Sequence, residues 1–158
     1  KRTKRMEKEL THFFDTTLST ALANLKTDSN AEWGTMTAKE MLIHLIQSSK
    51  MMHFGNNTLL IKEEYVEKAI DFLYTDKEIK KGLVVPNDIG FNFTKNVNEN
   101  IKELKDELIT SSDNMLGFLI ENTDFKAIHP YFGELDAKQW ILFQRKHYLH
   151  HLNQFGLL

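Results

Sequence analysis

The chain has 158 residues, of which 41% are apolar, so it can bury one hydrophobic core without disulfides. Its 20 Lys and Arg face 22 Asp and Glu, and this formal net charge of −2 offers no basic surplus for nucleic acid or an anionic membrane. The absence of cysteine excludes disulfides, thiolate metal sites and a cysteine nucleophile. This length predicts a single domain over residues 1–158. No run of about 18 apolar residues occurs, and we expect a cytoplasmic protein.

Helical periodicity dominates the first half of the chain. Apolar residues recur at spacings of three and four over residues 4–25, which predicts an amphipathic helix. Thr37 and Glu40 form a capping-box pattern, and a second helix is expected from Thr37 to about Phe54. A shorter helical pattern covers residues 59–73.

The stretch KKGLVVPNDIGFNF, residues 80–93, contains two Gly and a Pro and predicts a long loop. Long loops inside compact domains are often functional, although the sequence assigns no role to the part from Gly82 to Phe93. Strands are expected to contribute little, since the one weak candidate is Leu83–Val85.

Two further helices are predicted in the second half. Asn96 with Glu99 at the capping distance begins another long amphipathic helix. Asp136, with a glutamine three residues later, is expected to cap a last helix that runs to Gln154. Four main helices predict an all-α fold, a four-helix bundle with additional short helices and a long crossover loop.

The last helix carries three histidines within KHYLHHLNQFG. An α-helix advances about 100° per residue, so His147 and His151 share one inward stripe. His150 lies about 60° to the other side of His147, nearer Gln139 and Lys146. A single buried histidine is usually a hydrogen-bonded core residue, but two imidazoles one turn apart can aim at one point and hold a metal.

A metal site needs a third protein ligand, and the second helix offers His44 at the edge of its apolar arc. Three neutral imidazoles with an open fourth position are typical of a catalytic zinc site, whereas structural sites are normally closed. His53, near the end of the second helix, and His129, in the loop before the last helix, are rival ligands.

Other residues are candidates for the surroundings of such a site. His129, Trp140 and Gln144 are predicted to contact a substrate, while Gln144 and Glu40 could instead orient the ligating histidines. Trp33 lies just before the second helix, where an apolar residue can staple the incoming chain. No residue is assigned as a catalytic acid or base.

The segments WGTMTAKEMLIHLIQS and HPYFGELDAKQWILFQRKHYLHHLNQFG resemble a branch of unknown function in the DinB/YfiT-like superfamily. The resemblance runs from Trp33 to Gly156 and is dense in these two motifs. It implies a four-helix bundle with one long crossover connection. It also implies a divalent metal held by His44, His147 and His151.

The superfamily includes thiol-dependent transferases and isomerases and metal-dependent hydrolases. The resemblance therefore implies a hydrolase or thiol transferase that acts on a small molecule through zinc or nickel, which would lower the pKa of a bound water to about 7 or stabilise a thiolate. Because the chain lacks cysteine, a thiol would arrive as a low-molecular-weight cosubstrate. The alternatives are a non-catalytic metal-binding or interaction module, including a homodimer, and a metal-free bundle whose histidines pair with carboxylates.

Overall fold

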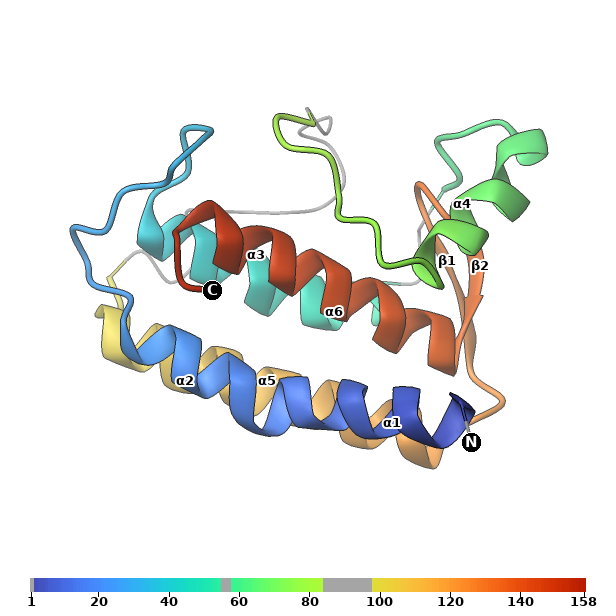
Figure 1. Cartoon of the computed structure of the whole chain (residues 1–158), viewed down its shortest axis with the longest axis horizontal. Coiled ribbons are helices and arrows are strands. Elements are labelled where there is room, and N and C mark those ends of the chain that lie inside the picture. The colour runs from blue at the N-terminus through green and yellow to red at the C-terminus, as the bar shows by residue number, and fades with distance from the viewer. Residues whose placement is uncertain (1, 55–57, 84–97) are drawn as a thin grey trace.

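The computed structural model describes residues 2–54, 58–83 and 98–158, and this part of the chain is mostly helical with a small two-stranded sheet. In chain order the elements are α1 (Arg2–His12), a π-helical turn (Phe13–Thr17), α2 (Leu18–Ala23), α3 (Ala38–Lys50), 3₁₀ turns (Met51–His53 and Glu63–Tyr65), α4 (Val66–Leu73), α5 (Ile101–Glu121), β1 (Lys126–His129), β2 (Gly133–Asp136) and α6 (Ala137–Gln154). Figure 1 shows the α1–α2 run lying along α5, and α3 lying along α6.

The first predicted helix is present, but a π-helical turn interrupts it at Phe13–Thr17. In an α-helix two consecutive side chains point about 100° apart, whereas here Phe13 and Phe14 are both buried and pack edge to face, with ring centroids 5.0 Å apart. Both rings also contact Tyr148 of α6. The wider turn therefore allows two adjacent aromatic residues to join one core.

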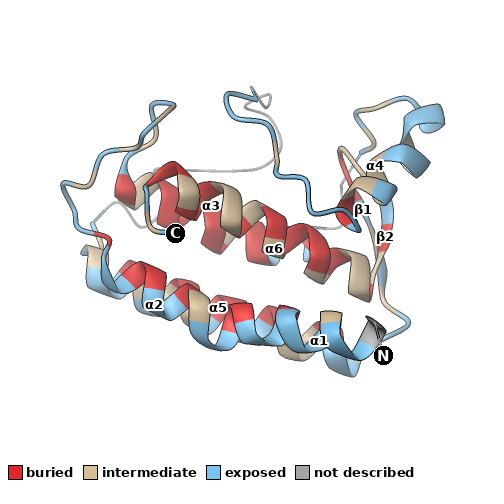
Figure 2. Cartoon of the chain, viewed as in Figure 1, coloured by how far each residue is buried: buried red, intermediate tan, exposed pale blue. Residues whose placement is uncertain are grey.

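The core lies between the helices. Figure 2 shows the buried residues on the faces that the helices turn toward one another, with exposed residues on the outside. Every residue of α6 is at least partly buried, and Trp140, Tyr148 and Leu152 on it have no exposed surface. No helix in the described residues is long and apolar enough to cross a membrane.

Side-chain caps fix where three of the helices begin. The predicted capping boxes at Thr37 and Asp136 are confirmed, because each side chain accepts a hydrogen bond from the backbone N–H of the third helical residue. In return, the backbone N–H of each cap donates to the side chain of that third residue. The predicted start at Asn96 is wrong. α5 is capped by Asn100 with Glu103, which repeats the Asn-x-x-Glu pattern four residues later, while Glu99 precedes the helix. Asn96 itself lies outside the described residues.

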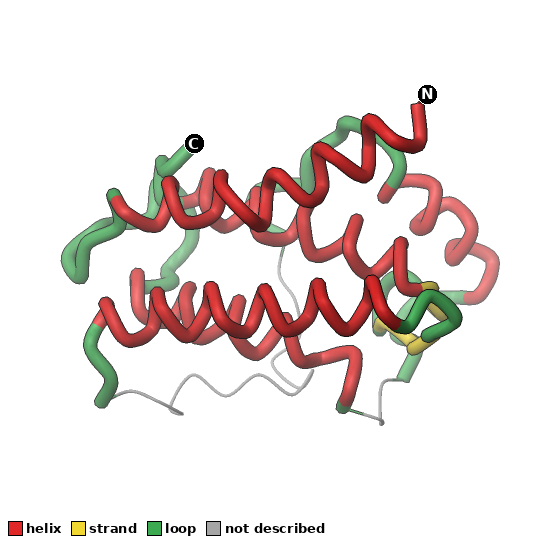
Figure 3. The backbone as a smooth tube through the Cα atoms, turned by 90° about the horizontal axis from the view of Figure 1, so that it is seen from below, coloured by secondary structure: helices red, strands yellow, loops and turns green. Residues whose placement is uncertain are grey.

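A β-hairpin was not predicted from the sequence. β1 and β2 pair antiparallel, with His129 opposite Gly133, at the end of the molecule where α6 begins. Figure 3 shows this small sheet in yellow at one end of the helices. Each strand has only four residues, which is too short for alternating polarity to be recognised.

The remaining expectations are met in part. The helical pattern of residues 59–73 forms only a 3₁₀ turn followed by α4. Its apolar residues pack on the core at the end of α4, where Leu73 is buried, whereas Leu60 and Tyr65 are exposed. The expected loop through Phe93 and the weak strand at Leu83–Val85 fall mostly on residues 84–97, which lie outside the described part of the chain.

Replacing Gly133 by alanine should destabilise the protein. Gly133 has φ +79°, and a Cβ there would lie 2.7 Å from Cγ1 of Val66 on α4. We expect a loss of about 1–3 kcal/mol in the free energy of unfolding, measured with urea. Gly117→Ala is the matched control: nothing lies within 4 Å of its added methyl group in α5, so a gain of about 0.5–1 kcal/mol is expected. Equal effects at both positions would contradict this interpretation.

Candidate metal centre

Three imidazoles meet between α3 and α6. Nε2 of His147 lies 2.9 Å from Nε2 of His44 and 3.1 Å from Nε2 of His151. The ligand atoms of the three rings all lie within 4.8 Å of one another. His147 and His151 are one turn apart on α6, as the helical stripe predicts, and α3 supplies His44 from across the helix interface.

A chain of hydrogen bonds fixes the proton of His147. Nε2 of Gln144 donates to the backbone carbonyl of Ser48 over 2.7 Å, and a carbonyl can only accept, so Oε1 is the atom of Gln144 that faces the Ser48 hydroxyl. The hydroxyl must donate its one proton to that oxygen, which leaves it to accept from Nδ1 of His147 over 3.0 Å. The proton of His147 is therefore on Nδ1, and Nε2 presents a lone pair.

His151 is fixed in the same way by another glutamine. Nε2 of Gln154 donates to the backbone carbonyl of Trp33 over 3.0 Å, so Oε1 of Gln154 faces Nδ1 of His151 at 2.8 Å. An amide oxygen only accepts, and Nδ1 must therefore carry the proton. Nε2 of His151 then also presents a lone pair toward the centre of the cluster.

Burial keeps these rings neutral. It lowers the pKa of His44 and His147 well below the usual histidine value, and the neighbouring His151 lowers both further. The pKa of His151 falls to about 4, again because of burial, against a smaller opposing effect of its hydrogen bond to Gln154. No described Asp or Glu forms an ion pair with His147 or His151.

The arrangement therefore places two acceptor nitrogens, those of His147 and His151, 3.1 Å apart with no proton to share between them. Two lone pairs at this distance repel each other, and the repulsion is relieved by a cation between them or in part by an N–H of His44, whose Nε2 lies 2.9 Å from Nε2 of His147. A tetrahedral ion with bonds of 2.0–2.1 Å holds its ligand nitrogens about 3.3 Å apart, which is close to the 2.9 and 3.1 Å that separate Nε2 of His147 from Nε2 of His44 and of His151. The donor set suits zinc, nickel, copper or iron.

The other histidines lie outside this cluster. His150 is half-buried beside His151, with ring centroids 5.0 Å apart, and its ring packs against Trp33. His53 is exposed and packs against Phe118 and Phe125, so the structure does not place it among the ligands.

His129 is buried at the end of β1 among aromatic rings. Its ring centroid lies 4.2 Å from that of Phe143, and its Nδ1 accepts a hydrogen bond from the backbone of Tyr131. Burial lowers the pKa of His129 to about 3. Phe143 also stacks on His147, so the ring of Phe143 lies between His129 and the cluster. Its predicted contact with a substrate stays a prediction.

Trp140 and Gln144, the other predicted substrate contacts, have no exposed surface. Gln144 acts on His147 through Ser48, as an orienting residue would, and a substrate role for either residue stays a prediction. Glu40 accepts a hydrogen bond from the backbone of Thr37 in the capping box and is not seen to contact a histidine.

The staple expected for Trp33 stays a prediction. Its ring lies beneath Lys81, with Nζ 4.4 Å from the ring centroid, and packs against His150 of α6. Lys146, next to His147 in the chain, is buried. Its ammonium group donates to the backbone carbonyl of Thr75 and lies over the ring of Phe72.

Ser48 and Gln154 were not assigned a role from the sequence. Both lie on the stripes that carry the ligands, since Ser48 is four residues after His44 and Gln154 is three after His151. A polar residue at such a spacing from a ligand, on an inward face, is the sequence feature that could have identified them.

Compared with models of protein families, with curated proteins and with solved structures, the chain gives no match. The resemblance to the DinB/YfiT-like superfamily therefore stays a prediction.

Acid should destabilise the metal-free protein through its neutral histidines. In the unfolded chain His129 takes up a proton below about pH 6.5, whereas in the folded protein it does so only near its pKa of about 3. Stability is therefore complete above pH 6.5 and falls as the pH decreases toward 3. At pH 5 His129 alone should cost about 2 kcal/mol, measured by urea unfolding in the presence of a chelator.

His129→Asn should make this dependence shallower, because the amide can still accept the hydrogen bond from Tyr131 but does not titrate. His12→Asn is the control, since His12 is exposed. The interpretation fails if stability does not change between pH 7 and pH 5.

Proposed function

We propose that His44, His147 and His151 bind one divalent metal ion, with zinc and nickel as the leading candidates. The observation that carries the proposal is the pair of hydrogen-bond chains, each ending on a backbone carbonyl, that point two Nε2 lone pairs at one place. Metal-binding histidines typically donate their other nitrogen to such a partner. Without a cation, the same hydrogen bonds hold these two acceptors against each other and leave His44 as the one ring of the three that can donate to them.

We further propose that the site is catalytic. His44 and His147 keep a small exposed surface although their rings are largely buried, and the described residues bring three protein ligands together, whereas structural zinc sites usually have four. An open fourth position that solvent can approach suits an ion that handles a substrate. A closed site, as the alternative of a non-catalytic metal-binding module requires, would enclose all of its ligands.

The proposed reaction is hydrolysis or thiol transfer on a small molecule. When bound, the ion supplies a Lewis acid that polarises an oxygen or stabilises a thiolate. The chain's own residues position the site: Ser48 and Gln154 keep the Nδ1 protons in place, and the stack of Phe143 on His147 restricts rotation of that ring. A thiol would have to come from a cosubstrate, because the chain has no cysteine.

The fold is proposed to be a four-helix bundle of the DinB/YfiT-like kind. The α1–α2 run, α3, α5 and α6 lie with their axes roughly aligned, and this supports the proposal. The motifs that carry the resemblance contain all three proposed ligands, and these meet although about a hundred residues separate His44 from His147.

Metal content tests the proposal directly. The purified, untagged protein should contain a stoichiometric amount of metal after loading with zinc or nickel, measured by elemental analysis. His44→Ala, His147→Ala and His151→Ala should each abolish it, because two imidazoles hold such an ion poorly. His150→Ala should retain the metal, since His150 is not in the cluster. Retention of metal by the His147→Ala variant would rule the site out.

The hydrogen-bond chains make a separate prediction. Ser48→Ala and Gln154→Leu should each weaken zinc affinity by about 10- to 100-fold, because the ligating ring loses the acceptor that fixes its proton. The affinity is measured by competition with a chelator of known strength. Ser112→Ala is the matched control: its buried hydroxyl contacts Tyr148 and no histidine, so it should lose stability but keep its zinc affinity. The role assigned to Ser48 is wrong if Ser112→Ala weakens zinc binding equally.

A further inference from the structure

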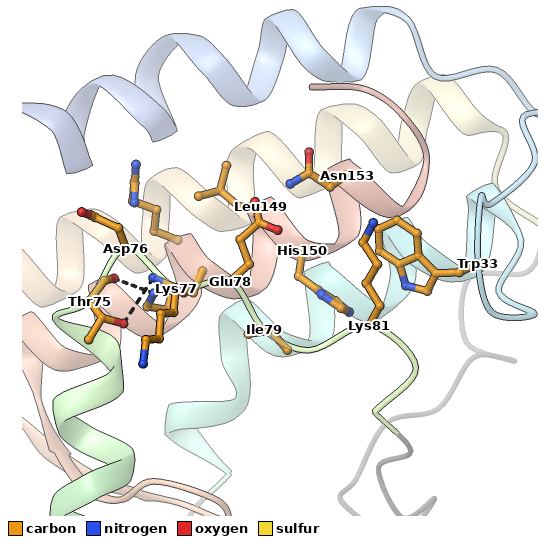
Figure 4. Close-up of a pocket in the computed structure, with 12 residues that line it drawn as sticks. Trp33, Thr75, Asp76, Lys77, Glu78, Ile79, Lys81, Leu149, His150 and Asn153 are labelled. Atoms are coloured by element: carbon orange, nitrogen blue, oxygen red, sulfur yellow. Dashed lines mark hydrogen bonds between the residues drawn. The ribbon is translucent and has the colours of Figure 1, made fainter.

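A separate cavity of about 200 Å³ lies beside the metal centre, on the outer side of α6. Figure 4 shows it between α6 and the segment of residues 75–81, with Trp33 and Lys81 at one end and Thr75 and Asp76 at the other. The residues of α6 that line it run from Arg145 to Asn153, about 12 Å along the helix axis. Pockets for drug-sized ligands measure about 300–1,000 Å³, so this one suits a smaller metabolite.

The lining carries both signs of charge. Four of its side chains are cationic and two are carboxylates: Lys77, Lys81, Arg145 and Lys146, with Asp76 and Glu78. None of the six forms a salt bridge with another described residue. Asp76 and Glu78 act on Lys146 only at longer range, where they oppose the lowering of its pKa by burial, so no direct ion pair has to be broken before a ligand that carries both charges can bind.

Arg145 provides the place for a carboxylate. Its Nε is buried and has no hydrogen-bond partner among the described residues, while its guanidinium carbon lies 5.9 Å from the centre of the Phe13 ring. A planar guanidinium presents Nε and a terminal nitrogen as a fork that matches the two oxygens of a carboxylate. The ammonium group of the neighbouring Lys146 already donates to the carbonyl of Thr75, so Arg145 is the better partner for a carboxylate.

Glu78 provides the place for an ammonium group. In Figure 4 it lies between the two ends of the cavity. The side chain is exposed, so binding a cation there costs little desolvation. The walls between these charged groups include the apolar side chains of Ile79 and Leu149 and the ring of Trp33, which can contact a short hydrocarbon side chain.

We propose that this cavity binds a small zwitterion of the α-amino acid type. The carboxylate of the ligand lies against Arg145, its ammonium group against Glu78, and its side chain against the apolar wall. The cavity adjoins the metal centre, because the carbonyl of Trp33 anchors Gln154 and Gln154 orients His151. Binding at the cavity itself does not depend on a metal.

The test uses L-leucine and two analogues that each lack one charge, 4-methylpentanoate and 3-methylbutylamine. The chain contains three arginines, Arg2, Arg5 and Arg145, so the Nε–H signal of Arg145 can be assigned by NMR from its absence in Arg145→Gln. L-leucine should shift this signal saturably. Each analogue should bind at least about tenfold more weakly, because one charge-assisted hydrogen bond is lost.

Two variants test the roles assigned to Arg145 and Glu78. Arg145→Gln, followed through the indole N–H signal of Trp33, and Glu78→Gln should each raise the dissociation constant for L-leucine about tenfold. Glu121→Gln, an exposed carboxylate away from the cavity, should leave it unchanged. Because Glu78 is exposed, its replacement tests the proposal even if Arg145→Gln does not fold.

Titrations of the metal-depleted and zinc-loaded chain distinguish binding in the cavity from chelation of the ion. Equal dissociation constants in the two forms support the cavity, whereas binding only to the zinc-loaded form overturns it. The proposal is also overturned if L-leucine causes no shift, or if 4-methylpentanoate binds as tightly as L-leucine. In the latter case the cavity is a simple anion site.

Discussion

The three-histidine cluster depends on one constraint, namely that a backbone carbonyl can accept a hydrogen bond but never donate one. The carbonyls of Ser48 and Trp33 therefore set the orientation of Gln144 and Gln154, and through them the protons of two imidazoles. The tautomer of each histidine is therefore set by its hydrogen-bond partners. The direction of each hydrogen bond starts in the main chain and is transmitted through one or two side chains to the Nε2 atoms.

This constraint requires that α3 and α6 keep a fixed register, because the Ser48 carbonyl and Gln144 belong to different helices. Several features hold that register. Capping boxes begin both helices, and Phe13 and Phe14 pack on Tyr148 from the opposite side of α6. A buried polar group that is left unpaired lowers the stability of the folded protein. These hydrogen bonds therefore favour the one packing that satisfies them.

The sequence was sufficient for features that depend on local spacing. The stripe of His147 and His151 and the caps at Thr37 and Asp136 follow from helical geometry alone. Features that depend on tertiary contacts were missed or misplaced. Asn96 and Asn100 carry the same capping pattern, and only packing selects between them. A lysine is ordinarily a surface residue, and Lys146 is buried only because the fold brings the carbonyl of Thr75 next to its ammonium group.

α6 explains why the three-histidine cluster and a charged cavity occur side by side. A helix that is enclosed on nearly every side would ordinarily be apolar all round, yet this one carries three histidines, two glutamines, an arginine and a lysine between residues 144 and 154. Core packing alone would favour apolar residues at such positions. The polar residues divide by angle: His147, His151, Gln144 and Gln154 face α3 and the Trp33 loop, whereas Arg145 and Asn153 face the cavity. One helix thus separates a site suited to a cation from a site suited to a zwitterion, and a ligand in the cavity lies against the same loop that fixes His151.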